Sequence, residues 1–465
     1  MFGNTCLLGV ANLFTKVLSF LTLPFFTAWL APEAYGLVDI LLTTAMLLLP
    51  LVTLNAAEAV FRFLVKGEDA RAVLSAALCF FILGGGALLL FTPLLSLLPL
   101  PRGYLFCLLW LVAASALHSL LVHILRAQGR YRLLAVQQIL CAAVTVTLQI
   151  VGIRVAHLGA LGYLFGVILG DFLTALFLLF PLLRHNKRAK MLAKPTLLPQ
   201  MLAYALPLVP TAALWWADAV LDRYMLRHFH GAGAVGTYAA AGKLPALLTL
   251  ATGVFLEAWH YAMARTGEGE RGKVFAHIYH LFLPCVVLAA VLLMFLGKWL
   301  LALLFAPAYA GAILPLPYLA LSALFAALSQ FLGSAFTTAM HTGKALSTSL
   351  AAIALNAVCN ALLIPRFGVA GAAFATFFAY LVLFFLRYFR LPYRPALRGA
   401  TVRLALALPW LLAGALAMEK ITWLSRSCLL VALLPFAGLL WESAAFLCRR
   451  ACRCLSSLKK CRKSE

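Results

Sequence analysis

Long stretches of apolar residues, separated by short polar turns, recur along the whole chain. Most exceed twenty residues, the length that an α-helix needs to cross the hydrocarbon core of a bilayer. The breaks between them predict an all-α polytopic membrane protein of about fourteen transmembrane helices. These spans are expected at residues 4–30, 36–64, 72–98, 103–126, 131–156, 160–184, 199–228, 234–263, 274–302, 310–340, 344–365, 368–391, 400–418 and 424–447.

The composition agrees with this pattern. Hydrophobic residues make up 65% of the 465 positions and charged residues 11%, whereas a soluble domain averages about 45–50% apolar and about 25% charged residues. No hydrophilic stretch is long enough to form a soluble domain. The first apolar run is too long for a signal-peptide core, so we interpret it as a retained span.

The net charge of +23 is explained by membrane topology. Two of the 37 basic residues, Lys16 and Lys243, lie inside predicted spans. Eight lie in the loops of one side: Arg102, Arg154, Arg223, Arg227, Lys298, Arg366, Lys420 and Arg426. The other 27 lie in the opposite loops and in the tail. The positive-inside rule then predicts that both termini are cytoplasmic, and the charge needs no nucleic-acid partner.

The chain resembles itself at an offset of 200 residues. Gly36 matches Gly236, and the loop residues Gly67, Glu68 and Arg71 match Gly267, Glu268 and Arg271. Each repeat holds an even number of spans, which predicts two parallel six-helix lobes. The predicted limits are 1–190 for the N-terminal lobe, 191–395 for the C-terminal lobe, 396–447 for two additional helices and 448–465 for a basic, cysteine-rich cytoplasmic tail.

Lys16 is a cation near the centre of the first span, and no acidic residue lies within one helical turn of it. Asn12, Lys16 and Ser19 are spaced to share one helix face. Because a charge inside the bilayer costs about 3 kcal/mol, such a residue is by default a functional candidate. We predict that these three residues line a central cleft.

Further ionisable residues gather in the first two spans of each lobe, and each has a structural alternative. Trp215 and Asp218 share a face in span 7, and Asp218 is expected at the depth of Lys243, so these two residues either line the cleft or form a mutual salt bridge. The candidates for coupling or gating are Asp39, Glu58, Arg62 and Glu257, although Glu58 and Arg62 are also spaced to pair on one helix. Asp222 and Arg223 are expected near the outer surface as a cap or loop anchor.

Prolines interrupt corresponding spans of the two lobes. Pro24 lies in span 1, and Pro207 and Pro210 lie in span 7. Proline removes a backbone donor and frees carbonyl groups, so it permits a helix to bend. Bending at matching places suits alternating access, and Pro24 and Pro207 are therefore candidate gating positions.

The sequence predicts no catalytic residue, cofactor or metal site. His118 and His123 are five residues apart and do not share a helix face, and Asp171 is expected to be a helix-packing contact. Most cysteines fall inside apolar spans, where they act as small hydrophobic residues. Cys448, Cys452, Cys454 and Cys461 in the tail lack the paired spacing of a zinc site.

Three segments carry a resemblance to a known family. They are "LTLPFFTAWLAPEAYGLVDIL" near the start, "LDRYMLRHFHGAGAVGTYAAAGKLP" at 221–245 and "NAVCNALLIPRFGVAGAAFAT" at 356–376. The chain resembles, nearly throughout and in order, the bacterial polysaccharide-biosynthesis flippases. These are the Wzx-type and SpoVB-like members of the multidrug/oligosaccharidyl-lipid/polysaccharide exporter superfamily.

The resemblance implies a two-lobed, non-enzymatic transporter that moves polyprenyl-diphosphate-linked oligosaccharide across the bacterial cytoplasmic membrane without hydrolysing ATP. It implies a cationic cleft, with Lys16 in a matching position, and partners among membrane lipids and the polymerase and glycosyltransferases of the same pathway. The predicted number of spans, fourteen, is closer to that of the SpoVB-like and lipid II flippase members than to that of many Wzx-type members. A lipid II flippase and a cation-coupled multidrug exporter therefore remain alternatives.

Overall fold

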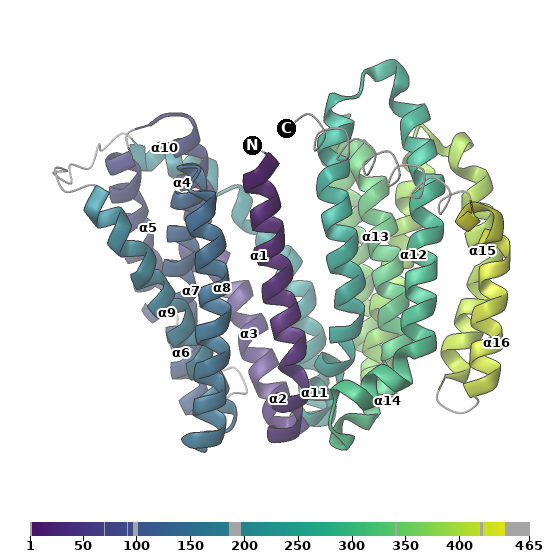
Figure 1. Cartoon of the computed structure of the whole chain (residues 1–465), viewed down its shortest axis with the longest axis horizontal. Helices are drawn as coiled ribbons and strands as arrows, with labels where there is room; N and C mark the ends of the chain where they lie inside the picture. The colour runs from purple at the N-terminus through teal and green to yellow at the C-terminus, as the bar shows by residue number, and fades with distance from the viewer. Residues whose placement is uncertain are drawn as a thin grey trace, which may run out of the picture. The chain divides into compact units, whose positions relative to one another are not determined.

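The computed structural model describes residues 2–68, 70–90, 92–95, 101–185, 197–339, 342–418 and 422–441. In these residues the fold is entirely helical (Figure 1). Contacts divide the chain into two compact units, Met1–Gly236 (unit 1) and Thr237–Glu465 (unit 2). The predicted boundary at residues 190 and 191 and the predicted tail of residues 448–465 lie outside the described residues.

Unit 1 is a bundle of helices that starts at the N-terminus, shown from purple to teal in Figure 1. It ends within α11, a long helix that continues into unit 2. The helices and the π-helical segment η1 have these bounds: α1 Phe2–Leu21, α2 Leu23–Trp29, α3 Pro32–Thr53, α4 Ala56–Val65, α5 Ala70–Leu90, α6 Thr92–Leu95, α7 Arg102–Ala127, α8 Tyr131–Ile150, η1 Val151–Val155, α9 Ala160–His185, α10 Leu197–Ala205 and α11 Leu208–Arg265.

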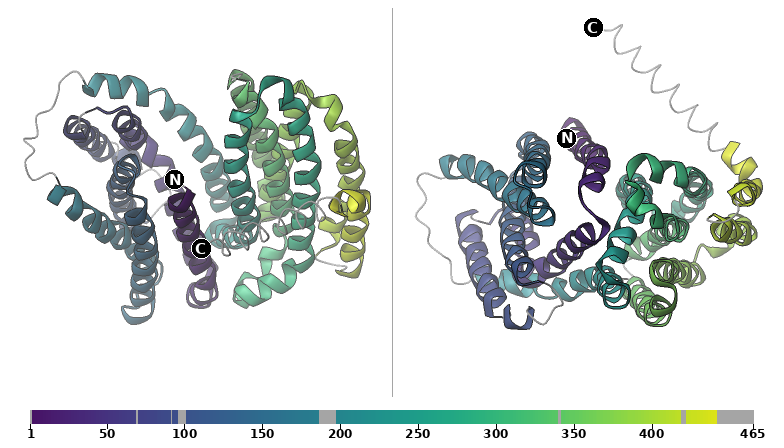
Figure 2. Two further views of the ribbon diagram at one scale, coloured as in Figure 1. Left: turned by 45° about the horizontal axis from the view of Figure 1, so that its top comes forward. Right: turned by 90° about the horizontal axis from the view of Figure 1, so that it is seen from below.

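Unit 2 continues from the second half of α11 to the yellow C-terminal helices of Figure 1. Seen along the helices in the right-hand view of Figure 2, its segments lie side by side as a bundle. The bounds are α12 Glu268–Leu304, η2 Pro307–Ile313, α13 Leu316–Thr338, α14 Thr342–Arg390, α15 Arg394–Ala417, α16 Thr422–Leu433 and η3 Leu434–Phe436.

The helices confirm the predicted fold class. Within the described residues, ten are long and apolar enough to cross a membrane. Two of these, α11 and α14, each join two helices across a glycine, Gly231 (φ 82°) and Gly368 (φ 54°). Both glycines fall at or beside predicted breaks between spans. Shorter apolar stretches at Phe14–Trp29 and Ser75–Leu90 occupy the first and third predicted spans, and together these segments account for all fourteen.

Apolar packing holds each unit together. In unit 2, α13 is the central helix, with 89% of its apolar window buried, and it contacts α12 and α14. An aromatic cluster forms beside it, in which Phe331 stacks on Trp259 with ring centroids 4.9 Å apart and lies 4.7 Å from Phe275. The Trp259 indole N–H donates to Ser334 Oγ at 2.8 Å, so the buried ring keeps a polar partner.

In unit 1, α8 and α9 approach closely because α9 carries glycine at every fourth position. Gly162, Gly166 and Gly170 face the preceding helix, and a methyl group at any of them would overlap atoms of Gly152, Gln149 or Thr145. Small residues spaced in this way let membrane helices pack backbone against backbone. This backbone contact fixes how far α8 can slide along α9, and so which side chains of the two helices lie at the same level.

Candidate functional site

Lys16 lies on an exposed face of α1, together with Asn12 and Ser19. The neighbouring hydroxyl groups are used within the helix, since Thr15 Oγ1 donates to the Asn12 carbonyl and Ser19 Oγ donates to the Thr15 carbonyl, both at 2.9 Å. Among the described residues, Lys16 forms no ion pair. The predicted cation is therefore free to meet an anionic ligand.

The predicted proline positions coincide with helix interruptions. α1 ends at Leu21 and α2 starts at Leu23, with Pro24 in its first turn. Pro207 lies in the two-residue gap between α10 and α11. Proline is tolerated in a first turn because the N–H group that it lacks would have no intrahelical acceptor.

Asp39 has a cationic partner that its sequence neighbours do not reveal. Its Oδ2 accepts a hydrogen bond from Arg223 Nε, which joins α3 to the first half of α11 within unit 1. Five residues further along α3, the Thr44 hydroxyl lies 3.1 Å from Tyr224 OH. Arg223, expected to anchor a loop, therefore holds two helices together. This part of α11, predicted to belong to the second lobe, packs against α3.

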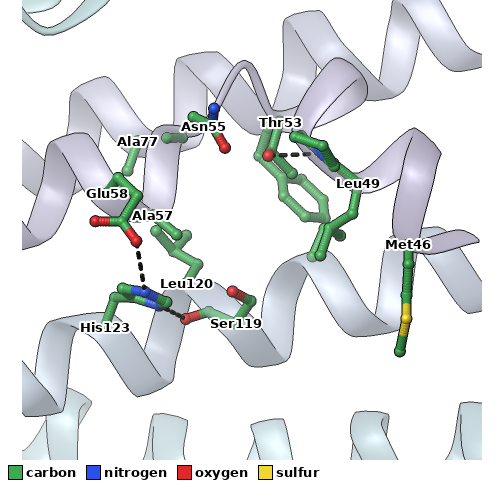
Figure 3. Close-up of a pocket in the computed structure, with 14 residues that line it drawn as sticks. Met46, Leu49, Thr53, Asn55, Ala57, Glu58, Ala77, Ser119, Leu120 and His123 are labelled. Atoms are coloured by element: carbon green, nitrogen blue, oxygen red, sulfur yellow. Dashed lines mark hydrogen bonds and ion pairs between the residues drawn. The ribbon is translucent and has the colours of Figure 1, made fainter. Parts of the chain in front are cut away.

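α3 and α4 are separated by a sharp break at Leu54 and Asn55. Both residues have left-handed backbone conformations, with φ of 48° and 53°. Non-glycine residues adopt this conformation at a cost of about 1–3 kcal/mol, and it concentrates at functional sites. The break opens a cavity of about 350 Å³, lined mainly by apolar side chains of α3, α4, α5 and α7 (Figure 3).

One wall of this cavity carries an ionisable pair. Glu58 Oε1 lies 3.7 Å from His123 Nε2 (Figure 3). His123 Nδ1 donates to the Ser119 carbonyl at 2.8 Å, because a carbonyl oxygen can only accept. A favourable contact with ionised Glu58 then needs a second proton on Nε2. Glu58 is thus beside His123 rather than paired with Arg62, which is exposed on α4.

The remaining predicted site residues are not brought together by the described side chains. Lys243 is half-buried and Glu257 exposed, both on the unit 2 part of α11. The side chains of Trp215 and Asp218 lie outside the described residues. The predicted salt bridge between Asp218 and Lys243 therefore stays a prediction.

Two polar clusters were missed by sequence reasoning. In unit 2, Arg387 is one of the 27 basic residues predicted to lie in the cytoplasmic loops and tail, and it is only 6% exposed. It donates to the Ser329 carbonyl at 2.7 Å and to Ser349 Oγ at 3.0 Å. In unit 1, His118 Nδ1 lies 3.0 Å from Asp171 Oδ1. The sequence hints at the second cluster only in that polar residues of nearby predicted spans, such as His118 and Asp171, are expected at similar levels in the membrane.

The long apolar helices define a multi-pass membrane protein. The model of the polysaccharide biosynthesis protein family matches residues 2–260, more than half of the chain. The chain belongs to this family. No curated protein matches the chain.

Solved structures show the same fold. The lipid II flippase MurJ in an inward closed conformation matches with a TM-score of 0.71 and 14% identity, over 95% of this chain and 100% of that chain. An inward-facing multidrug resistance MATE family transporter of the MOP superfamily matches with a TM-score of 0.58 and 16% identity, over 82% of this chain and 95% of that one. A mutant of the Vibrio cholerae MATE transporter VcmN matches with a TM-score of 0.53 and 14% identity, over 86% of this chain and 99% of that one.

Proposed function

We propose that the protein flips a polyprenyl-diphosphate-linked oligosaccharide across the bacterial cytoplasmic membrane for cell-surface polysaccharide synthesis. The observation that carries the proposal is the exposed Lys16 on α1, which has no ion pair among the described residues, in a chain of the polysaccharide biosynthesis family. A diphosphate carries about two negative charges that must cross a low-dielectric layer. A lysine can accompany such a mobile group because it acts as a flexible point charge.

In this proposal Asn12 and Ser19 flank the diphosphate on the same helix face as Lys16. Lys243, Asp218 and Trp215 are the further candidate contacts in this proposal, for the sugars or for a second charge. The polyprenyl tail stays in the surrounding lipid. The partners are then membrane lipids and the polymerase and glycosyltransferases of the pathway, and both termini face the cytoplasm.

Alternating access would use the helix interruptions at Pro24 and Pro207 in lobes of residues 1–190 and 191–395. The chain's own ionisable groups offer a coupling mechanism. Glu58 and His123, 3.7 Å apart on α4 and α7, are the pair that we propose for this role. Asp39, Arg62 and Glu257 are the further candidates for coupling or gating.

Transport into vesicles tests the role of Lys16. Full-length protein is reconstituted with a fluorescent undecaprenyl-diphosphate glycan, and flipping is measured by accessibility of the glycan to an enzyme outside the vesicle. We expect Lys16→Ala to abolish flipping and Lys16→Arg to retain part of it. Lys273→Ala, which removes a lysine predicted to lie in a cytoplasmic loop, is the matched control and should transport normally. Normal transport by Lys16→Ala would refute the cationic anchor.

A lipid II flippase is the second candidate, and it is supported by the likeness to MurJ over 95% of this chain. The same vesicles distinguish the two when they contain lipid II in place of the glycan lipid. Faster flipping of lipid II would favour the second candidate. A cation-coupled multidrug exporter is supported by the likeness to MATE transporters, and uptake of cationic dyes with neither lipid flipped would favour it.

A further inference from the structure

Three consecutive helices of unit 1 bring His118, Cys141 and Asp171 to one place. One donor atom of each residue lies within 4.8 Å of the other two. Asp171 Oδ1 is the shared atom, at 3.0 Å from His118 Nδ1 and 3.8 Å from Cys141 Sγ. The residues come from α7, α8 and α9, so the cluster depends on the packing of the unit and not on local sequence.

The close approach of α8 and α9 fixes two of the three ligands. Gly170 leaves no room for a methyl group against Thr145, and Asp171 follows Gly170 directly. Cys141 lies one helical turn before Thr145, on the same face of α8. The glycine spacing of α9 therefore holds the carboxylate beside the thiol.

Neighbouring side chains orient the cluster. Ser115 Oγ donates to Asp171 Oδ2 at 2.6 Å, which turns Oδ1 toward His118 and Cys141. On the other side, the Gln137 amide nitrogen contacts His118 Nε2. Gln137 is 1% exposed, and within the described residues its Oε1 is buried without a hydrogen-bond partner. An unpaired buried acceptor of this kind is unfavourable.

Turning the Gln137 amide by half a rotation would bring Oε1 to His118. Oε1 then accepts from His118 Nε2–H, the arrangement in which a second group fixes the tautomer of a metal-binding histidine. His118 Nδ1 is left with its lone pair directed at Asp171 Oδ1, only 3.0 Å away. A metal ion bound by both groups would make this close approach favourable.

We propose that His118, Cys141 and Asp171 bind a zinc-class divalent metal ion. Imidazole, thiolate and carboxylate are the ligands that Zn²⁺ combines in proteins. Bond lengths of about 2.0–2.3 Å place tetrahedral ligands about 3.3–3.8 Å apart. The 3.8 Å between Cys141 Sγ and Asp171 Oδ1 lies within this range, and the 3.0 Å between His118 Nδ1 and Asp171 Oδ1 lies just below it, so binding would move these two atoms slightly apart.

The charges also balance. Thiolate and carboxylate together neutralise the divalent ion, which limits the desolvation cost inside a membrane-embedded unit. A fourth position is left for water. This site shares no residue with the proposed substrate contact at Lys16, so it stands whatever the transported molecule is. Its expected effect is to tie α7, α8 and α9 together and to stabilise the folded protein.

Metal titration of the purified full-length protein tests the proposal. The four tail cysteines are first replaced by serine, so that Cys448, Cys452, Cys454 and Cys461 cannot bind the metal. We expect one equivalent of Zn²⁺ per chain and a rise in Tm with Zn²⁺ concentration. Co²⁺ in its place should give a thiolate-to-metal charge-transfer band, which reports the sulfur ligand directly.

Substitutions identify the ligands. Cys141→Ser should remove the cobalt charge-transfer band, and Cys141→Ser and Asp171→Asn should each weaken Zn²⁺ binding by about a hundredfold or more. Ser115→Ala, which removes only an orienting hydrogen bond, should weaken it by about tenfold. Cys107→Ser and His123→Gln change the same residue types elsewhere on α7 and should bind as the parent does.

Thiol labelling gives a test that needs no ligand substitution. Zn²⁺ should protect Cys141 from a maleimide in the parent protein, whereas Cys285, which is exposed, should stay reactive. The proposal is overturned if Zn²⁺ leaves Cys141 labelling unchanged, or if Cys141→Ser and Asp171→Asn bind Zn²⁺ as tightly as the parent.

Discussion

Gly36 of α3 and Gly236 of α11 face each other with their backbones in contact. A methyl group on Gly36 would overlap the Ala232 carbonyl and the Gly236 amide, and one on Gly236 would overlap the Pro32 carbonyl. These two glycines are also the first matched pair of the internal repeat, at an offset of 200 residues. Equivalent positions of the two repeats therefore meet each other.

Replacing either glycine should separate the two helices. We expect Gly36→Ala and Gly236→Ala each to destabilise the protein by about 1–3 kcal/mol or more, because the obstructing atoms belong to backbone and cannot rotate away. Thermal unfolding in detergent measures the effect. Gly242→Ala is the matched control on α11, where no atom lies within 4 Å of the added methyl group. It should be neutral or slightly stabilising.

The ion pair of Asp39 and Arg223 should behave as one unit. The side chains are 16% and 19% exposed, so removing one partner leaves a poorly hydrated charge. We expect Asp39→Asn or Arg223→Gln to lower the free energy of unfolding by several kcal/mol at most. The double variant should lose clearly less than the two single losses combined. Strict additivity would mean that the two side chains do not interact in the membrane.

Pro24 should matter for movement more than for stability. Pro24→Ala restores a backbone donor where α1 and α2 are interrupted, so we expect one continuous helix and an unchanged or higher Tm. Flipping should slow, because the bend can no longer form easily. Pro395→Ala, at the start of α15, is the control, since a proline in a first turn there has no proposed motion to support. Equal flipping rates for the two variants would remove Pro24 from the gating proposal.

Arg387 allows a test of what a buried charge contributes. Its two hydroxyl acceptors also make other hydrogen bonds. Thr348 Oγ1, which lies 3.4 Å from Arg387 Nε, donates to the Lys344 carbonyl at 3.0 Å, and Ser349 Oγ donates to the Ala345 carbonyl at 3.1 Å. Arg387→Met should therefore leave no group unpaired and keep or raise Tm, because it removes a costly buried charge. Arg387→Lys keeps the charge without the planar fork and should lower Tm. The reverse order would show that Arg387 has an anionic partner.

The spans were predictable because each segment is apolar enough by itself to be recognised as membrane-spanning. Twenty apolar residues, a glycine or proline and a polar turn suffice to place a helix, and the kinks at Gly231 and Gly368 fall at or beside expected breaks. The exposed position of Lys16 also agrees with its lack of a local acidic partner.

The contacts between helices were not predictable from one sequence. Arg223 reaches Asp39 across 184 positions, and nothing in either segment specifies the rotation of α11 that brings them together. The cluster of His118, Cys141 and Asp171 has the same origin, because it depends on how three helices are turned about their axes. The glycines at 162, 166 and 170 were visible in the sequence, but the helix that they face was not.

α13 is apolar enough to contact lipid, yet in the folded protein it is covered almost entirely by other helices. Its mean hydropathy is 1.7, and 89% of its apolar window is covered by protein in the finished fold. α14, which it contacts, follows it in the chain and is synthesised later. The part of α13 that α14 covers is therefore bare until α14 has been made, and its apolar composition suits it to contact lipid during that interval.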